Sequence, residues 1–265
     1  MYKAVFLDLD DTLLDSNKNI SEENKEAIEY AKQKGGLVCI ASGRSIEITK
    51  KYRNLVNAST YIIYSNGAGI FDCDANEKLF SADIEKEIVL ELYDYSVKNN
   101  IGIRIDTPYG RFINKEEYAI NLDILLKPEE AVTLIAENDI LQISLLFEYE
   151  EKRTEAIDFV NENISKTIKI ENIFKTGYGD KFFAINIVNR NVSKGNAMNG
   201  LCKFLKIDIK DVIAIGDGLN DISMIKTAGL GVAMENAEKE VKEIADEITS
   251  TNLENGVAKI LRAKF

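Results

Sequence analysis

Two carboxylates follow the first apolar run of the chain and are well placed to do chemistry. Asp8 and Asp10 come directly after residues 3–7 (KAVFL). Alternate residues of an extended segment project to the same side, so these two side chains can converge. Like charges at that spacing repel each other and require a cation between them or a proton on one of them. The pair therefore indicates a metal-assisted or acid–base site, although the same residues also suit a polar turn.

Two further segments have the composition of an anion-binding turn. Ser42, Gly43 and Arg44 follow the apolar run 37–41 (LVCIA) and precede a helical pattern. A small hydroxyl, a glycine and a helix N-terminus together form a seat for an anion. Lys194 stands at the start of another predicted helix, where the helix dipole disfavours a cation. Neighbouring carboxylates or a phosphate would explain a lysine at this position. The alternatives are a plain strand-to-helix turn at residues 42–44 and a solvent-exposed lysine at position 194.

The fourth segment is GDGLND, residues 216–221, directly after the apolar run 212–215 (VIAI). Gly216 and Gly218 suit a tight turn with close backbone approach. Asp217 and Asp221 carry carboxylate oxygens, the ligands that Mg²⁺ prefers. The segment predicts a magnesium site, with an ordinary Asp-Gly turn as the alternative.

The elements that position these segments alternate between strand and helix. Strands are predicted at 3–7, 37–41 and 61–64, and helices after Ser21 and over 46–55. The same rhythm returns from Ser193 onward, with strands at 212–215 and 231–234. Such alternation is typical of a parallel α/β sheet, in which ligands bind beyond the carboxyl ends of the strands. We therefore expect an α/β fold with a Rossmann-like parallel-sheet core.

The middle of the chain departs from this rhythm. Hairpins mixed with helices over residues 83–188 predict an α+β module inserted into the α/β domain, which would comprise residues 1–82 and 189–265. The loop 175–181 (KTGYGDK), with Tyr178 at its centre, combines flexible glycines with an aromatic ring and two cations. It is our candidate for substrate recognition, against the alternative of an exposed hairpin loop.

Composition excludes several classes of site. The chain of 265 residues contains no histidine, which excludes Ser–His–Asp triads and histidine-ligated zinc or haem. The net charge of −11 argues against a nucleic-acid-binding surface. Three scattered cysteines form no disulfide framework and suit a reducing compartment. No segment reaches the ~20 apolar residues of a membrane span, and residues 1–10 lack a signal-peptide pattern, so we expect a cytoplasmic protein with no membrane partner.

Taken together, the four segments resemble a known family. DLDDT at 8–12, SGR at 42–44, SKG at 193–195 and GDGLND at 216–221 match the motifs of haloacid-dehalogenase-superfamily phosphatases. The sequence is similar to the Cof-type group, in which a large α/β cap is inserted between the second and third motifs. The resemblance covers essentially the whole chain and departs at Asp11, where many members have glycine.

The resemblance implies a covalent mechanism. Asp8 would be the nucleophile that forms an aspartyl-phosphate, which divides one difficult transfer into two easier ones. Asp10 would protonate the leaving oxygen and then activate water. Thr12 would fix the loop that carries both acids.

It also implies a set of binding residues. The phosphoryl group would be held by Ser42, Gly43, Lys194 and Asn220. Mg²⁺ would bind Asp8, the backbone carbonyl of Asp10, and Asp217, with Asp221 in support. Charge counting agrees with a cation, because four carboxylates face one lysine and would repel a phosphate.

The resulting prediction is a Mg²⁺-dependent phosphatase for small phosphorylated metabolites such as sugar phosphates, pyridoxal phosphate or flavin mononucleotide. The cap would act as a lid and choose the substrate; the sequence does not indicate an oligomeric state. The alternatives are a phosphomutase or phosphotransferase on the same site and a non-enzymatic phospho-acceptor domain. Asp10 argues against dehalogenation, which needs no acid for a leaving oxygen.

Overall fold

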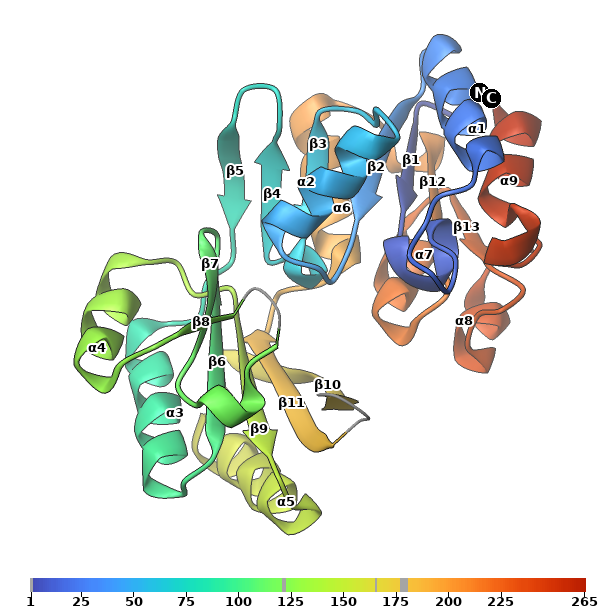
Figure 1. Cartoon of the computed structure of the whole chain (residues 1–265). Coiled ribbons are helices and arrows are strands. Elements are labelled where there is room, and N and C mark those ends of the chain that lie inside the picture. Colours follow the sequence, from blue (N-terminus) through green and yellow to red (C-terminus); the bar gives the residue numbers. More distant parts are fainter. Residues whose placement is uncertain (1, 121–122, 165, 177–180) are drawn as a thin grey trace. The chain divides into compact units, whose positions relative to one another are not determined.

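The computed structural model describes residues 2–120, 123–164, 166–176 and 181–265. The chain forms two compact units (Figure 1). The first comprises Met1–Phe80 and Val192–Phe265, and the second, the inserted unit, comprises Ser81–Asn191. The second unit is therefore a single continuous segment, whereas the first is assembled from both ends of the chain.

The first unit is built on one mixed sheet whose central strands are parallel. The strands are, in spatial order, β14 (Glu247–Ile248), β13 (Leu230–Ala233), β12 (Val212–Gly216), β1 (Ala4–Leu7), β2 (Leu37–Ala41), β3 (Tyr61–Tyr64), β4 (Gly69–Asp72) and β5 (Glu77–Ser81). Pairing is parallel from β14 to β3, and β4 then runs antiparallel to β3. This arrangement confirms the predicted α/β class.

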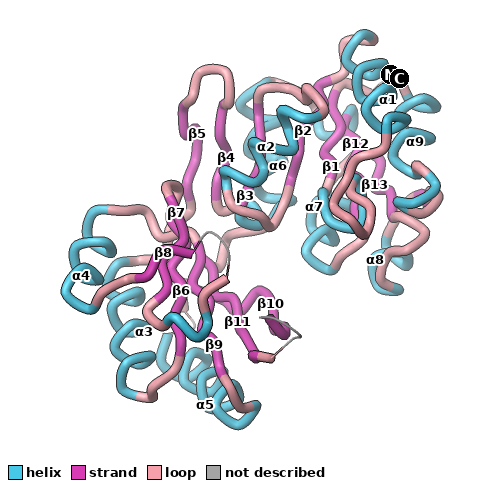
Figure 2. The backbone as a smooth tube through the Cα atoms, viewed as in Figure 1, coloured by secondary structure: helices cyan, strands magenta, loops and turns pink. Residues whose placement is uncertain are grey.

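The central strands form because they are apolar on both faces. All four residues of β1 are fully buried, and so are residues 212–215 of β12. A strand with a continuous apolar sequence is stable only where helices cover both faces of its sheet. In Figure 2, helices stand around these strands. They are α1 (Glu22–Gln33), α2 (Ile46–Leu55), α6 (Lys194–Leu205), α7 (Ile222–Thr227), α8 (Lys239–Ile244) and α9 (Gly256–Lys264).

Local signals set the ends of two of these helices. Ser21 caps α1 by accepting a hydrogen bond from the N–H of Asn24 at 3.2 Å. Ser193 caps α6 in the same way, accepting from the N–H of Asn196 at 3.0 Å. Each cap satisfies an N–H that has no partner inside the helix.

The inserted unit is an antiparallel sheet with helices. Its strands are, in spatial order, β10 (Ile168–Thr176), β11 (Phe182–Asn189), β9 (Gln142–Phe147), β6 (Gly102–Thr107), β7 (Gly110–Ile113) and β8 (Asp123–Leu125). Within this second sheet, β7 and β8 pair in parallel, and the other described pairs are antiparallel. The helices are α3 (Lys86–Lys98), α4 (Pro128–Glu137) and α5 (Glu150–Phe159). Alternate residues of β6 and β9, including Ile103 and Leu145, belong to its apolar core.

Among the described residues, no helix combines the length and the apolarity that crossing a membrane requires.

Candidate active site

Three neighbouring strands deliver the predicted site residues to one edge of the core sheet. Strands β12, β1 and β2 lie side by side and run parallel. Asp217 follows β12, Asp8 follows β1 and Ser42 follows β2. Because the carboxyl ends of parallel strands meet at the same edge, residues distant in sequence become neighbours there.

Lys194 joins two of the carboxylates inside the protein. Its Nζ lies 2.5 Å from Oδ1 of Asp8 and 2.6 Å from Oδ1 of Asp221, and both Lys194 and Asp221 are fully buried. Burial alone would lower the pKa of Lys194, but the charges of Asp221 and Asp8 outweigh it and raise the pKa. The lysine is therefore charged, which explains a cation in the first turn of α6 against the helix dipole.

Asp221 also fixes the turn that follows β12. Its Oδ2 accepts hydrogen bonds from the backbone N–H groups of Asp217 and Gly218, both at 3.0 Å. A Cβ on Gly216 would lie 2.5 Å from Cγ of Asp221, so this position has no room for a side chain. Thr12 completes the arrangement by donating its hydroxyl to Oδ1 of Asp217 at 2.7 Å.

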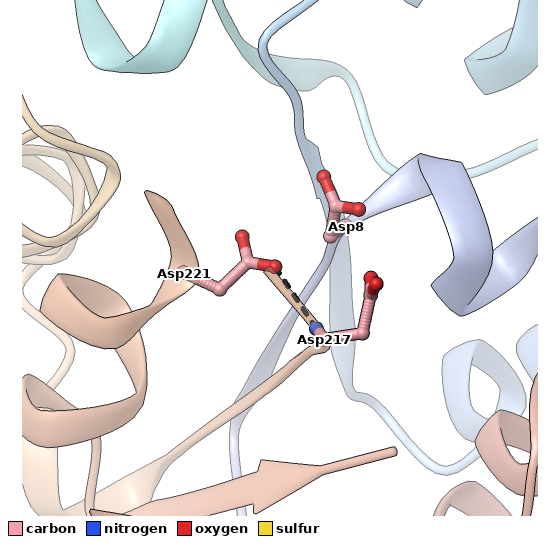
Figure 3. Close-up of side chains that lie close together, drawn as sticks. All are labelled: Asp8, Asp217 and Asp221. Carbon is pink, nitrogen blue, oxygen red and sulfur yellow. Dashed lines mark hydrogen bonds between the residues drawn. The ribbon is translucent and has the colours of Figure 1, made fainter. Parts of the chain in front are cut away.

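The carboxylates of Asp8, Asp217 and Asp221 gather at these strand ends (Figure 3). One oxygen from each lies within 4.8 Å of the others. Both oxygens of Asp221 are already engaged, by Lys194 and by the backbone of the turn. Within the described chain, Oδ2 of Asp8 and Oδ2 of Asp217 accept no hydrogen bond. The site therefore offers a hard cation the free oxygen of Asp217 together with a carboxylate oxygen of Asp8, and this donor set fits Mg²⁺, which keeps several waters and takes one or two carboxylates.

The electrostatics of the site also fit a cation. Burial raises the pKa of Asp8 well above its usual range, in spite of the opposing charge of Lys194. Burial raises the pKa of Asp217 to about 7, helped by the charge of Asp221 and opposed by the hydrogen bond from Thr12. Burial disfavours the charged form of both groups, and when they ionise the site also holds more negative charge than Lys194 neutralises. A divalent cation would remove that excess.

Asp10 stands apart from this cluster. Arg44 donates to it through Nε at 2.7 Å and Nη2 at 2.6 Å, and Nζ of Lys18 donates at 2.7 Å. Burial would raise the pKa of Asp10, but the hydrogen bonds from Arg44 and Lys18 outweigh it and lower the pKa to about 2. The carboxyl group is therefore ionised in this arrangement.

The reason for this separation is a turn in the backbone. Residues Leu9–Leu13 form an irregular turn instead of a continued strand, closed by a hydrogen bond of 2.8 Å from the N–H of Leu14 to the carbonyl of Leu9. The expected convergence of the Asp8 and Asp10 carboxylates assumes an extended segment, and the turn breaks that assumption. The carboxylate of Asp10 is not among the clustered ligands found in the described residues.

The remaining predicted residues lie at the same strand ends. Ser42 is buried, and its Oγ accepts a hydrogen bond from the N–H of Arg44 at 3.2 Å, whereas Gly43 is exposed. Asn220 is half-buried and donates through Nδ2 to Oδ1 of Asn66 at 2.9 Å. Sequence reasoning singled out neither Asn66 nor Lys18 for the site. The available signal for Asn66 was its place just after strand β3.

The loop 175–181, which we predicted for substrate recognition, lies largely outside the described residues. Residues 177–180, which include Tyr178, lie outside the described part of the chain.

Comparisons with known proteins agree on one family. The family described as haloacid dehalogenase-like hydrolase matches residues 5–261. The 5-amino-6-(5-phospho-D-ribitylamino)uracil phosphatase YcsE of Bacillus subtilis is 32% identical over 98% of this chain and 94% of its own length. The phosphatase YwpJ of the same organism is 31% identical over 98% of this chain and 99% of its own.

Solved structures extend the likeness to the whole fold. The crystal structure of TM0651 from Thermotoga maritima has a TM-score of 0.86 at 27% identity, over 99% of this chain and 97% of that one. A sugar phosphatase of subclass IIB of the superfamily has a TM-score of 0.75 at 25% identity, over 98% of both chains.

Proposed function

Because the chain belongs to the haloacid dehalogenase-like hydrolases and is a phosphatase, we propose that it hydrolyses small phosphorylated metabolites through an aspartyl-phosphate on Asp8. We further propose that the reaction requires Mg²⁺. The observation that carries both proposals is the buried Asp8–Lys194–Asp221 arrangement beside Asp217. It leaves one oxygen of Asp8 free to attack and one oxygen of Asp217 free to bind a cation.

In the first step, Oδ2 of Asp8 attacks phosphorus while the bond from phosphorus to the ester oxygen breaks. Lys194 holds the other oxygen of Asp8 at 2.5 Å, which orients the free oxygen and neutralises part of the charge on the phosphoryl group. A fixed nucleophile in a preorganised field needs little reorganisation during the transfer. The backbone N–H of Gly43 and the hydroxyl of Ser42 suit the oxygens of the transferring group.

Asp10 would supply the proton that the leaving oxygen takes. A carboxyl with a pKa of about 2 is almost entirely ionised at neutral pH. The acid role therefore requires that Asp10 leave Arg44 and Lys18 and take up a proton before the ester bond breaks. In the second step Asp10 would accept a proton from water as the water oxygen attacks phosphorus, which releases orthophosphate and regenerates Asp8.

A bound Mg²⁺ would polarise the phosphoryl oxygens and offset the charge of the carboxylates. Asp8 and Asp217 are the residues that would hold it through side chains. Asp217 would use Oδ2, which accepts no hydrogen bond among the described residues, and Asp8 would use Oδ1, because its Oδ2 attacks phosphorus. The backbone carbonyl of Asp10 is proposed as a further ligand from the family pattern. Thr12 and Asp221 would keep Asp217 in place through the hydrogen bonds given above.

The substrate class that best suits these relatives is a phosphorylated sugar or polyol. YcsE is named for a phosphate carried on a ribityl chain, and one structural relative is named a sugar phosphatase. We extend that class to this chain as a proposal and assign the choice among such substrates to the inserted unit.

A screen for phosphate release tests the proposal. The purified protein is assayed against sugar phosphates, ribityl phosphates, pyridoxal phosphate and flavin mononucleotide, each with Mg²⁺ and with chelator. We expect orthophosphate from one or more sugar or polyol phosphates, and only with Mg²⁺. An isomerised sugar phosphate without free orthophosphate would instead indicate a mutase. A single labelling of the protein without turnover would indicate a phospho-acceptor domain.

A further inference from the structure

A fourth strand of the core sheet also ends at the site, and the residues after it are conformationally unusual. Strand β3 neighbours β2 and is followed by Ser65, Asn66 and Gly67. Their φ angles are 48°, 56° and 95°, all in the left-handed region. Such conformations are costly for non-glycine residues and persist only where the surroundings hold them. The two non-glycine residues, Ser65 and Asn66, therefore require a compensating set of contacts.

The first contacts are to the turn that follows β2. The N–H of Ser65 donates to the carbonyl of Arg44 at 2.9 Å, and the N–H of Asn66 donates to the carbonyl of Ser42 at 3.0 Å. A Cβ on Gly43 would lie 2.8 Å from Oδ1 of Asn66, so the side chain of Asn66 packs directly on that glycine. The Ser42–Arg44 backbone is therefore held from one side by residues 65 and 66.

The same segment packs against the start of helix α6. A Cβ on Gly67 would lie 2.3 Å from the carbonyl oxygen of Ser193 and 3.0 Å from the backbone nitrogen of Lys194. Only glycine leaves room for this approach, and its φ of 95° is one that glycine adopts freely. The segment thus contacts the backbone that carries the buried lysine.

The side chain of Asn66 reaches a third segment of the site. Its Oδ1 accepts a hydrogen bond of 2.9 Å from Nδ2 of Asn220, which is 154 residues away in sequence. Asn66 is only 3% exposed, so its end of this bond is shielded from water. An amide NH₂ group has two donors. With one donor fixed on Asn66, the other donor of Asn220 has a defined direction.

The left-handed backbone alone does not explain this residue. Asn76, in the turn between β4 and β5, also has a positive φ of 52°, but it is exposed. At position 76 asparagine accommodates the positive φ, and its side chain makes no hydrogen bond among the described residues. Asn66 combines the same backbone with a part-buried bond to Asn220, which lies beyond the carboxyl end of β12.

On the premise of the proposed function, we propose that Asn66 is a positioning residue for phosphoryl transfer. Its side chain fixes the amide of Asn220 and supports Gly43, so that the donors from two separate segments keep one arrangement around the phosphoryl group. Because the phosphoryl group is common to all substrates, the effect of Asn66 extends to every phosphomonoester that the enzyme hydrolyses.

The test is a double-mutant cycle between Asn66 and Asn220. Asn66→Gly removes the amide and accepts the positive φ, and Asn66→Ser is a second variant, because Ser65 adopts a similar φ in the same turn. We expect each to lower kcat/KM by about 10- to 100-fold for sugar phosphates and for p-nitrophenyl phosphate alike. Asn220→Ala is expected to cost a similar factor alone, but less than about threefold when added to Asn66→Gly.

The matched control is Asn76→Gly, which makes the same substitution at a left-handed asparagine away from the site. We expect it to keep kcat/KM within about twofold, since Asn76 is exposed. Inorganic phosphate provides a readout independent of turnover, and its inhibition constant is expected to rise in Asn66→Gly and stay unchanged in Asn76→Gly.

Three results would overturn the proposal. Losses that simply multiply in the double variant would show that Asn66 does not act through Asn220. Activity of Asn66→Gly equal to that of Asn76→Gly would remove the role altogether. Failure of both Asn66 variants to fold would assign the residue to folding instead. A wild-type protein that releases no phosphate from any ester would contradict the proposed function itself, which is a separate outcome.

Discussion

At the scale of single residues, the site is held together by one buried cation between two carboxylates. Removing one partner of a buried ion pair leaves an uncompensated charge, which costs far more than the net contribution of the pair. Lys194 is fully buried between Asp8 and Asp221, so its removal leaves two such charges.

We therefore expect Lys194→Met to lower the free energy of unfolding by about 3–5 kcal/mol and to abolish turnover. Adding Asp221→Asn is expected to restore part of the stability, because it removes one of the unpaired charges. The control is Lys239→Met, in an exposed pair with Glu243, which should change stability by less than about 1 kcal/mol. Denaturant unfolding without Mg²⁺ measures all three, and equal effects of the two lysine variants would contradict the arrangement.

A second residue-scale prediction concerns pH. The pKa of Asp217 is raised in the folded protein to about 7 from 3.8, mainly by burial. A raised carboxyl pKa contributes stability that is complete below about pH 4 and is lost as the pH rises through 7. Without Mg²⁺, the unfolding free energy of the wild type should fall across this window more steeply than that of Asp217→Asn.

Mg²⁺ should offset the loss of stability that the wild type shows at high pH relative to Asp217→Asn. A ligand that binds only the folded state stabilises it. At pH 8 we expect the added cation to raise the midpoint of thermal unfolding of the wild type and to have little effect on Asp217→Asn. Parallel pH curves for the two proteins, together with equal responses to Mg²⁺, would rule out Asp217 as the titrating ligand.

The partners of single residues are the part of the site that the sequence predicts least well. Asp8 and Asp217 could be located because each follows an apolar run. The pairing of Asp10 with Arg44 could not, because it depends on the irregular turn that follows Asp8 and on a side chain 34 residues away. Spacing along one sequence contains no information on either.

At the scale of elements, the site depends on where strands end and where one helix begins. The end of β1 supplies Asp8, and the first turn of α6 supplies Lys194. The hydrogen bond from the N–H of Asn196 to Ser193 fixes that first turn. Loosening the cap should therefore displace the lysine as well as weaken the helix.

This gives a matched pair of variants. Ser193→Ala and Ser21→Ala each remove one helix cap, and each is expected to lower the unfolding free energy by about 1 kcal/mol. Only Ser193→Ala is expected to lower kcat/KM as well, by about tenfold, because only α6 carries a residue of the site. Unfolding curves and phosphate-release kinetics on both variants check this. Equal activities of the two variants would show that the Ser193 cap does not contribute to catalysis.

Elements with continuous apolar sequences are predicted well from the sequence. The short apolar runs of β1, β2 and β12 are typical of parallel strands that are buried on both faces.

The hydrophobic pattern of the sequence predicts neither α4 nor the short strand β8. In helix α4 the buried residues are Ala131 and Ile135, and the exposed Val132 adds an apolar residue outside that buried face, which obscures the helical period. Strand β8 has only three residues, two of them exposed, so it lacks the burial that marks a strand.

At the scale of the whole molecule, the chain consists of two units with separate cores. The main apolar cluster of the inserted unit consists of residues of that unit alone, from Ile84 to Ile187. The ends of this unit are tied to each other and to its interior, since Asn189 donates to the carbonyl of Asp83 at 3.0 Å and Ile84 donates to that of Ile140 at 2.8 Å. The segment therefore has what an independent domain needs.

We expect a fragment of residues 81–191 to fold alone, with cooperative thermal unfolding and no phosphatase activity. Asn189→Ala within the fragment should lower its midpoint by a few degrees, because it removes the tie between the ends. Circular dichroism on both fragments measures this. A fragment without a cooperative transition would show that the inserted unit depends on the rest of the chain.

The nucleophilic role of Asp8 is the claim on which the proposed reaction rests, and one experiment addresses it directly. A substrate from the screen, labelled in its phosphoryl group, is mixed with the enzyme and Mg²⁺ and quenched in acid within one turnover. Peptides are then mapped for the label, with Asp8→Asn in parallel. We predict label on the peptide that carries Asp8, and in Asp8→Asn no label and turnover reduced by at least about a thousandfold with the fold intact. Turnover by Asp8→Asn above about one per cent of wild type, or label on any other residue, would contradict the mechanism.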